Sequence, residues 1–321
     1  MLLGLNLSTA PKTLISAIQG SSATSPMTGS VVTVSAIVVG DFQTGDADNS
    51  REMGGFYLQE EDSDSDNDDS TSEGIFIYEG STMMTDVNLG DLVEVTGTVA
   101  EYKESTQIST VTSVKVVSSS NSLPTAAVIV FPMSVVELEA YEAMRVAIDG
   151  DMIITDMYNL ARYGEISLSK TRGYSYTQQN PPGNPAGYAE YLDEIAKNKI
   201  TYDDGLSTQN NDVSLLDGFG PSFSTATAPR MGDVMTGLAG ILEYSFDKWR
   251  IHSTFDGQNN VSKVNTRTES PPDVLEGVDG AVKIASLNVL NFFNTLSEDG
   301  ATAGPPPGLE PRGANSQEEF E

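Results

Sequence analysis

The sequence predicts a mainly β fold, and three observations support this class. Short β-branched segments with near-alternating apolar residues recur from Val31 to His252, whereas Val135–Glu142 has its apolar residues at helical spacing. Stretches rich in Ser, Gly and Pro separate these segments. The chain has 321 residues, of which 38% are apolar, so it is long enough for two domains with packed cores.

The N-terminal region predicts a small barrel. Its five expected strands are Val31–Val39, Gly55–Gln59, Gly74–Tyr78, Asp91–Val99 and Gln107–Val117. Gly97 lies inside the fourth strand, where it would let a long strand bend. Five short strands of this kind favour a closed barrel of the OB type, and an open sandwich of five or more strands is the alternative.

A second β region follows a Ser-rich linker and begins with the short helix Val135–Glu142. Its expected strands are Val146–Ile154, Glu165–Leu168, Lys199–Tyr202, Gly232–Tyr244 and Lys248–His252. A Gly-Asp pair precedes a long strand in both regions, at Gly90-Asp91 and at Gly232-Asp233. This parallel indicates a duplicated OB-like barrel, with a chance match as the alternative.

A third region begins after a polar tract and contains the strand pattern Val282–Phe293. Asn315 or Ser316 then offers an N-cap for a helix, so we expect a further domain that starts but does not finish. The expected organisation is an N-terminal segment (1–14), a first OB-like β domain (15–118), a linker (119–134), a second OB-like β domain (135–262), a linker (263–281) and the start of the further domain (282–321).

Charge and composition exclude several classes of function. The chain has 17 Lys and Arg against 46 Asp and Glu, a net charge of −29, so a generic basic DNA-coating protein is excluded. It has no Cys and one His, His252, which excludes disulfides and any Cys or His-cluster metal site. No basic residue precedes Lys12, and no apolar run is long enough for an export signal or a membrane span. Acidity of this degree is common in proteins that work outside the cell.

An acidic loop between the second and third strands predicts a calcium site. Its candidate ligands are Asp62, Asp64, Asp66, Asp68 and Glu73, and side-chain oxygens stand at positions 1, 3, 5 and 12 of the EF-hand spacing. Alternate side chains on such a loop point inward toward a hard cation. Asn67 occupies the position at which an EF-hand loop has Gly. The acidic loop is also expected between strands and not between helices, so a solvated acidic hairpin is the alternative.

Basic and aromatic residues in the second β region predict a nucleic-acid surface. Nine of the 17 basic residues lie there, interleaved with tyrosines, as base stacking and phosphate contact require. The candidate contacts are Arg162, Tyr163, Lys170, Arg172, Tyr174 and Tyr176. Alternatively, the aromatic rings pack the barrel while the basic residues pair with acids such as Glu165 and Asp247. His252 follows Trp249 on an expected strand, which favours a structural role for it.

Several motifs along nearly the whole chain resemble one family. They are Ile15–Gly20 (ISAIQG), Gly55–Glu60 (GFYLQE), Thr71–Phe76 (TSEGIF), Tyr158–Glu165 (YNLARYGE), Lys283–Phe293 (KIASLNVLNFF), Arg312–Asn315 (RGAN) and Glu318–Glu321 (EEFE). In this order they resemble the OB-like region and the opening of the endonuclease/exonuclease/phosphatase domain in secreted bacterial nucleases of the ExeM/NucH type.

This resemblance implies a function for the parent protein. The further domain would be a truncated α/β sandwich of the DNase I type, and Asn288 would lie in its metal and phosphate pocket. The remaining ligands and bases of that pocket would follow the end of the chain, so the chain alone is expected to be inactive. The implied protein is a secreted, extracellular endonuclease that hydrolyses DNA with Mg²⁺ or Ca²⁺ and needs neither a membrane nor an obligate protein partner.

Two alternatives remain open at the level of the sequence. One is a calcium-stabilised extracellular adhesion or spacer module that does not bind nucleic acid. The other is the N-terminal part of a phosphatase or nucleotidase, because one fold can support several phosphoesterase activities. Salt-sensitive DNA binding would separate the nuclease from the spacer.

Overall fold

The computed structural model describes residues 12–46, 51–180, 183–210, 228–253 and 262–264. Of these residues 38% are in strands and 15% in helices, which confirms the mainly β class. All of the described residues belong to one compact unit. The expected strand Val282–Phe293 and the candidate residue Asn288 lie outside the described residues.

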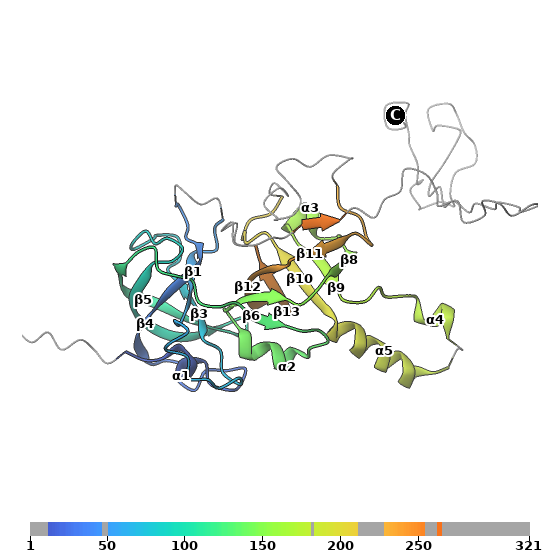
Figure 1. Ribbon diagram of the computed structural model, residues 1–321, viewed down its shortest axis with the longest axis horizontal. Helices are drawn as coiled ribbons and strands as arrows, with labels where there is room; N and C mark the ends of the chain where they lie inside the picture. The colour runs from blue at the N-terminus through green and yellow to red at the C-terminus, as the bar shows by residue number, and fades with distance from the viewer. Residues whose placement is uncertain (1–11, 47–50, 181–182, 211–227, 254–261, 265–321) are drawn as a thin grey trace, which may run out of the picture. The chain divides into compact units, whose positions relative to one another are not determined.

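The N-terminal strands form a closed five-stranded barrel with the order β1-β2-β3-β5-β4 (Figure 1). The strands are β1 (Val31–Phe42), β2 (Gly55–Gln59), β3 (Gly74–Tyr78), β4 (Leu92–Tyr102) and β5 (Ser105–Ser118). β3 and β5 pair in parallel, and the other neighbours are antiparallel. The ladder between β4 and β5 shifts register beside Gly97, where an added Cβ would lie 2.5 Å from Ile108, so only glycine fits this bend.

The core of the barrel follows from strand alternation. Every second residue of β4 from Val93 to Val99 is buried, as expected for a strand with one face on a core. The short helix α1 (Ile15–Gln19) adds Ile15 and Ile18 to the same core. The amide of Gln19 donates to the carbonyl of Gly74 at 2.6 Å, which ties the helix to the start of β3.

The second β region forms one nine-stranded sheet with the order β14-β11-β8-β9-β10-β13-β12-β7-β6. Its strands are β6 (Ala127–Ile129), β7 (Arg145–Ile148), β8 (Met152–Asp156), β9 (Ile166–Ser169), β10 (Lys199–Asp203), β11 (Val234–Thr236), β12 (Ala239–Ser245), β13 (Lys248–His252) and β14 (Ser262–Val264). The sheet is curled, and β6 lies inside the segment expected to be a linker (Figure 1).

Two expected strands are each divided in the structure. Gly150, with φ of +69°, separates β7 from β8, and Gly237, with φ of +66°, separates β11 from β12. The positive φ at each glycine interrupts the extended backbone, so one long apolar pattern becomes two short strands in each case.

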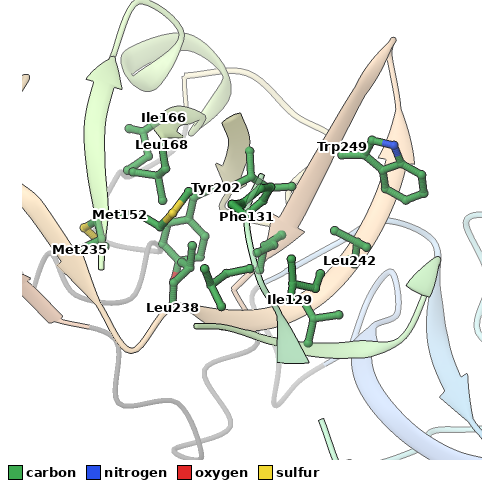
Figure 2. Packing of buried hydrophobic residues seen from close by; sticks show 14 of the residues in the cluster. Ile129, Phe131, Met152, Ile166, Leu168, Tyr202, Met235, Leu238, Leu242 and Trp249 are labelled. Atoms are coloured by element: carbon green, nitrogen blue, oxygen red, sulfur yellow. The ribbon is translucent and has the colours of Figure 1, made fainter. Parts of the chain in front are cut away.

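The concave side of the curled sheet holds an apolar core. Figure 2 shows Tyr202 and Met152 facing Met235 and Leu238, with Trp249 and Leu242 on the neighbouring strands. All six side chains are at most 5% exposed. This burial is the main source of stability in this half of the unit.

Helices in this region are short except for one. They are α2 (Val135–Leu138), the 3₁₀ turn η1 (Glu139–Tyr141), α3 (Leu160–Tyr163), α4 (Tyr176–Gln179) and α5 (Pro185–Lys197). α5 begins with Pro185 behind an Asn184 side chain that accepts from Gly187 N, and it buries none of its residues. Among the described residues, no helix is long and apolar enough to cross a membrane.

The barrel and the sheet contact each other directly. Phe42, Tyr57 and Phe76 from the barrel share an apolar cluster with Ala143 and Ile241 from the second region. The Tyr57 ring centroid lies 4.6 Å from that of Phe76. This contact brings the ends of β4 and β12 together and so positions the site described below.

Candidate functional site

The carboxylates of the acidic loop accept hydrogen bonds from nearby backbone N–H groups and hydroxyls. Asp62 accepts from the backbone N of Thr125 at 2.8 Å and from its hydroxyl at 2.6 Å. Asp66 Oδ1 accepts from the backbone N of Asp68 at 2.8 Å, and Asp68 Oδ1 accepts from Ser70 N at 3.0 Å. The hydroxyl and then the backbone N of Thr125 lower the pKa of Asp62, and the hydroxyl and then the backbone N of Ser70 lower the pKa of Asp68. The side chains therefore follow the local turns of the loop.

The five predicted calcium ligands are not brought together. Glu73 is buried, whereas Asp62, Asp64, Asp66 and Asp68 are exposed. In the described part of the chain, no group of three or more His, Asp or Glu is placed to hold a metal ion. A calcium site with the EF-hand spacing therefore stays a prediction.

The predicted nucleic-acid contacts fall in separate places. The Arg162 guanidinium lies 5.1 Å from the ring centroid of Tyr163 on α3, and its Nε donates to Gln209 at 2.9 Å. Lys170 donates to the carbonyl of Asp149, and Arg172 is exposed. In Figure 1, α3 lies well away from α4 and α5, so the six residues do not form one surface.

Tyr174 and Tyr176 belong to an aromatic cluster on α4 and α5. The Tyr191 ring centroid lies 4.6 Å from that of Tyr174 and 5.5 Å from that of Tyr176, and Tyr188 is 5.5 Å from Tyr176. The Tyr191 hydroxyl also donates to the carbonyl of Tyr174 and accepts from its amide, both at 2.7 Å. These rings hold the segment before α4 against α5. The sequence did not single out Tyr188 or Tyr191, although their i, i+3 spacing on a helix places them on one face.

A cavity of about 470 Å³ lies where the barrel meets the sheet. Its lining includes three aromatic side chains that are unusually exposed: Tyr78 at 44%, Tyr102 at 59% and Phe246 at 65%. Tyr78 ends β3, Tyr102 ends β4, and Phe246 follows β12. Exposed rings around one cavity are typical of a binding site and not of a folding core.

Two tight hairpin turns meet at this cavity. Lys103 and Glu104 join β4 to β5, and Phe246 and Asp247 join β12 to β13. All four residues have positive φ, between +52° and +66°, which is the pattern of a type I′ turn. That turn normally uses Asn and Gly, and a bulky residue such as Phe adopts it at a conformational cost. Strain of this kind is concentrated at functional sites.

Cationic groups lie beside the Phe246 ring. Lys103 Nζ is 5.8 Å and Arg250 Cζ is 5.7 Å from its centroid, one from each side of the junction. Both distances are within the range of a cation–π interaction. Lys103 is exposed and forms no ion pair with any residue that the structure describes.

Arg250 itself belongs to a buried ion cluster at the floor of the cavity. Its Nη1 donates to Asp203 at 2.5 Å and to Glu165 at 3.1 Å. Lys248, which is partly exposed, donates to the other oxygen of Glu165 at 2.9 Å. This arrangement agrees with the expectation that basic residues of this region pair with acids such as Glu165. The pairing neutralises most of the positive charge at the floor.

His252 completes the ion cluster. Its Nδ1 lies 3.1 Å from Asp203 Oδ1, and its Nε2 contacts Glu243 Oε2. Both partners are acceptors, so both ring nitrogens carry a proton and the imidazole is positively charged. Burial lowers the pKa of His252, but Glu243 and Asp203 raise it more strongly, to about 9. Burial and the charge of Asp203 raise the pKa of the adjacent Asp204 to about 7.

The sequence did not reveal this cavity because its rings come from distant segments. Tyr78, Tyr102 and Phe246 each end a strand or lie in a turn, and nothing local marks them as neighbours. The sequence offered no clear signal, because the expected strands end at Val99 and begin again at Gln107, and this hides the two-residue turn at Lys103 and Glu104.

Comparison with protein-family models finds no match to this chain, and comparison with curated proteins finds no significant match.

Proposed function

We propose that this chain is the nucleic-acid-binding part of a secreted, metal-dependent endonuclease, and that the cavity between barrel and sheet binds unpaired bases of DNA. The observation that carries the proposal is the group of exposed rings at the cavity, Tyr78, Tyr102 and Phe246, next to the cation of Lys103. The motifs that resemble nucleases of the ExeM/NucH type support the same assignment. On this proposal the five-stranded barrel is of the OB type and the curled sheet is a second, OB-related module.

The chemistry of the cavity favours single strands. A base stacked on an aromatic side chain contributes about 1–3 kcal/mol, and this contact requires a base that is free of its duplex partner. Ser105, Gln107 and Ser207 also line the cavity and offer hydrogen-bonding groups to base edges. Duplex DNA presents mainly phosphates, for which this chain of net charge −29 has little affinity.

The predicted binding depends only weakly on salt. Arg250 is committed to carboxylates, so Lys103 is the main cation available for a phosphate at the cavity. One neutralised phosphate on single-stranded DNA gives a slope of about −0.7 in log K against log salt. Stacking therefore contributes more to affinity than charge does.

The hydrolytic part of the proposal rests on the resemblance alone. Asn288 is the residue carried over from that family's metal and phosphate pocket, and it lies outside the described residues. Mg²⁺ or Ca²⁺ would activate water in that pocket.

Fluorescence anisotropy of a labelled oligothymidylate of about 15 nucleotides tests the proposal on the full chain. The decisive variant is Phe246→Asn, because Asn removes the ring yet suits the positive φ at this turn, so the fold is kept. We expect binding to weaken by about tenfold or more, since one stacking contact is lost. Tyr158→Ala is the matched control, because Tyr158 is 91% exposed and lies outside the cavity.

Three results would contradict the proposal. Equal binding by Phe246→Asn and the parent chain would exclude the cavity, and loss of binding only in the double variant Arg162→Ala, Lys170→Ala would move the site to the surface predicted from the sequence. No saturable binding at any salt concentration would leave these β regions as a spacer module.

A further inference from the structure

Two glutamates face each other at the base of the acidic loop. Gln59 of β2 pairs with Gly74 of β3, so the next residues outward, Glu60 and Glu73, lie directly opposite each other. The backbone N of Glu60 donates to the carbonyl of Glu73 at 3.0 Å. Directly opposed residues in antiparallel strands have Cβ atoms about 5 Å apart, which places the two carboxylates side by side.

Both carboxylates are buried, and each has one oxygen without a donor. Glu60 is 5% exposed and Glu73 is 8% exposed. Glu60 Oε1 accepts from Ile15 N at 2.5 Å, and Glu73 Oε1 accepts from Asp66 N at 3.0 Å. The Oε2 atoms of both residues are buried without a hydrogen-bond partner. Buried carboxylate oxygens are normally satisfied, so this pair requires an explanation.

No positive side chain compensates the pair. Within the described ranges, neither Glu60 nor Glu73 forms an ion pair with Lys, Arg or His. Burial, and next a side-chain hydrogen bond with Glu73, raises the pKa of Glu60 to about 9, and the charges of Glu73 and Asp64 raise it further. Two ionised carboxylates in contact are unstable in a low-dielectric site unless they share a proton or a cation.

We propose that Glu60 and Glu73 hold a Ca²⁺ ion between their free Oε2 atoms, with water and oxygens of the acidic loop as the remaining ligands. Ca²⁺ accepts six to eight oxygen ligands in irregular geometry, whereas Mg²⁺ requires a near-ideal octahedron that a flexible loop does not supply. The pair differs from the EF-hand spacing, because Glu60 precedes that motif and Asp62 and Asp68 are bonded to Thr125 and Ser70.

The bound ion would connect three parts of the barrel. Glu60 holds the first residue of α1 through Ile15, Glu73 holds the loop through Asp66, and the two glutamates flank the β2–β3 hairpin. An ion that binds only the folded state stabilises it by mass action. Calcium should therefore raise the unfolding temperature of the chain.

Calcium titration of the full chain, freed of metal by chelation and dialysis, tests this site. We expect saturable binding by calorimetry, an unfolding temperature that rises with CaCl₂ and a smaller rise with MgCl₂. The double variant Glu60→Gln, Glu73→Gln should bind Ca²⁺ at least tenfold more weakly. Its amide oxygens can still accept from Ile15 N and Asp66 N, so the fold is retained. Asp69→Asn, an exposed acid of the same loop, is the control and should bind as the parent chain does.

Two outcomes would overturn the site. If the double variant binds Ca²⁺ as tightly as the parent, or if Asp62→Asn with Asp68→Asn abolishes binding instead, the ion belongs to the loop alone. If the parent chain binds no Ca²⁺ and the double variant is more stable, the two glutamates share a proton and no cation.

Discussion

His252 shows how neighbours determine the chemistry of a residue. As the single histidine of the chain it suggests a catalytic base, yet carboxylates face both of its ring nitrogens. A ring held doubly protonated has no lone pair with which to accept a proton. The structure therefore supports the structural role that the sequence favoured for this residue.

This geometry predicts how stability depends on pH. The pKa of His252 rises from its ordinary 6.5 to about 9 on folding, so its contribution is complete below pH 6.5 and is lost as the pH rises to about 9. The loss is on the order of 3 kcal/mol in the free energy of unfolding. Asp204, with its pKa raised to about 7, changes stability in the same direction.

Urea unfolding at a series of pH values between 6 and 9.5, with EDTA present, measures this dependence. His252→Gln should be less stable than the parent at pH 6 and should show a shallower decline toward pH 9. A free energy of unfolding that stays level or increases over this interval in the parent chain would refute a charged His252.

Single residues also show where the sequence was informative. The alternation of Val93, Val95 and Val99 predicted a strand with one buried face, and the barrel has it. Phe246 could not be predicted as a site residue, because its importance comes from a strained turn and from Lys103, which is far away in the chain. A local sequence pattern predicts which face of a strand is buried. It does not predict which strand ends lie next to each other in the fold.

At the scale of single elements, helix α5 is held in place by side-chain contacts on the protein surface and not by burial in a core. None of its residues is buried, so the packing that normally fixes a helix is small here. The hydroxyl of Tyr191 instead bonds both backbone groups of Tyr174, and aromatic contacts with Tyr176 add to this attachment. The sequence analysis missed this helix although Tyr188, Tyr191 and Ile195 stand at helical spacing, because their tyrosines were not counted as an apolar face.

Tyr191→Phe tests this attachment, since it keeps the ring and removes both hydrogen bonds. We expect the amide of Tyr174 to exchange its hydrogen at least tenfold faster, while the unfolding temperature stays nearly unchanged because α5 buries no core residue. Hydrogen exchange read by mass spectrometry measures the first effect and thermal unfolding followed by circular dichroism measures the second, with Tyr188→Phe as the control. Unchanged exchange at Tyr174, or a large fall in unfolding temperature, would contradict this account of the helix.

Strand boundaries were predicted less well than strand positions. β2, β3 and β13 match their expected ranges, whereas Gly150 and Gly237 each divide an expected strand in two. Glycine has no intrinsic preference for positive φ, so the sequence alone cannot show whether a glycine bends a strand or ends it.

At the scale of the whole molecule, the junction between barrel and sheet creates the candidate site. Arg51 donates to the hydroxyl of Ser253 at 3.0 Å, and Phe42 lies 5.7 Å from the His252 ring, so groups about two hundred residues apart are in contact. No periodicity encodes such contacts. The sequence therefore predicted two β regions, but its candidate contact residues, from Arg162 to Tyr176, do not include the residues that line the junction.

Photo-cross-linking of a halogenated oligothymidylate to the full chain tests the central claim most directly. Mass spectrometry would then identify the cross-linked residues. We expect adducts on Tyr102 and Phe246. Both adducts should be lost in the Phe246→Asn variant, whose fold is intact. If adducts form only on Tyr163 and Tyr174, the cavity does not bind nucleic acid. The same conclusion follows if no adduct exceeds the background given by an unrelated protein.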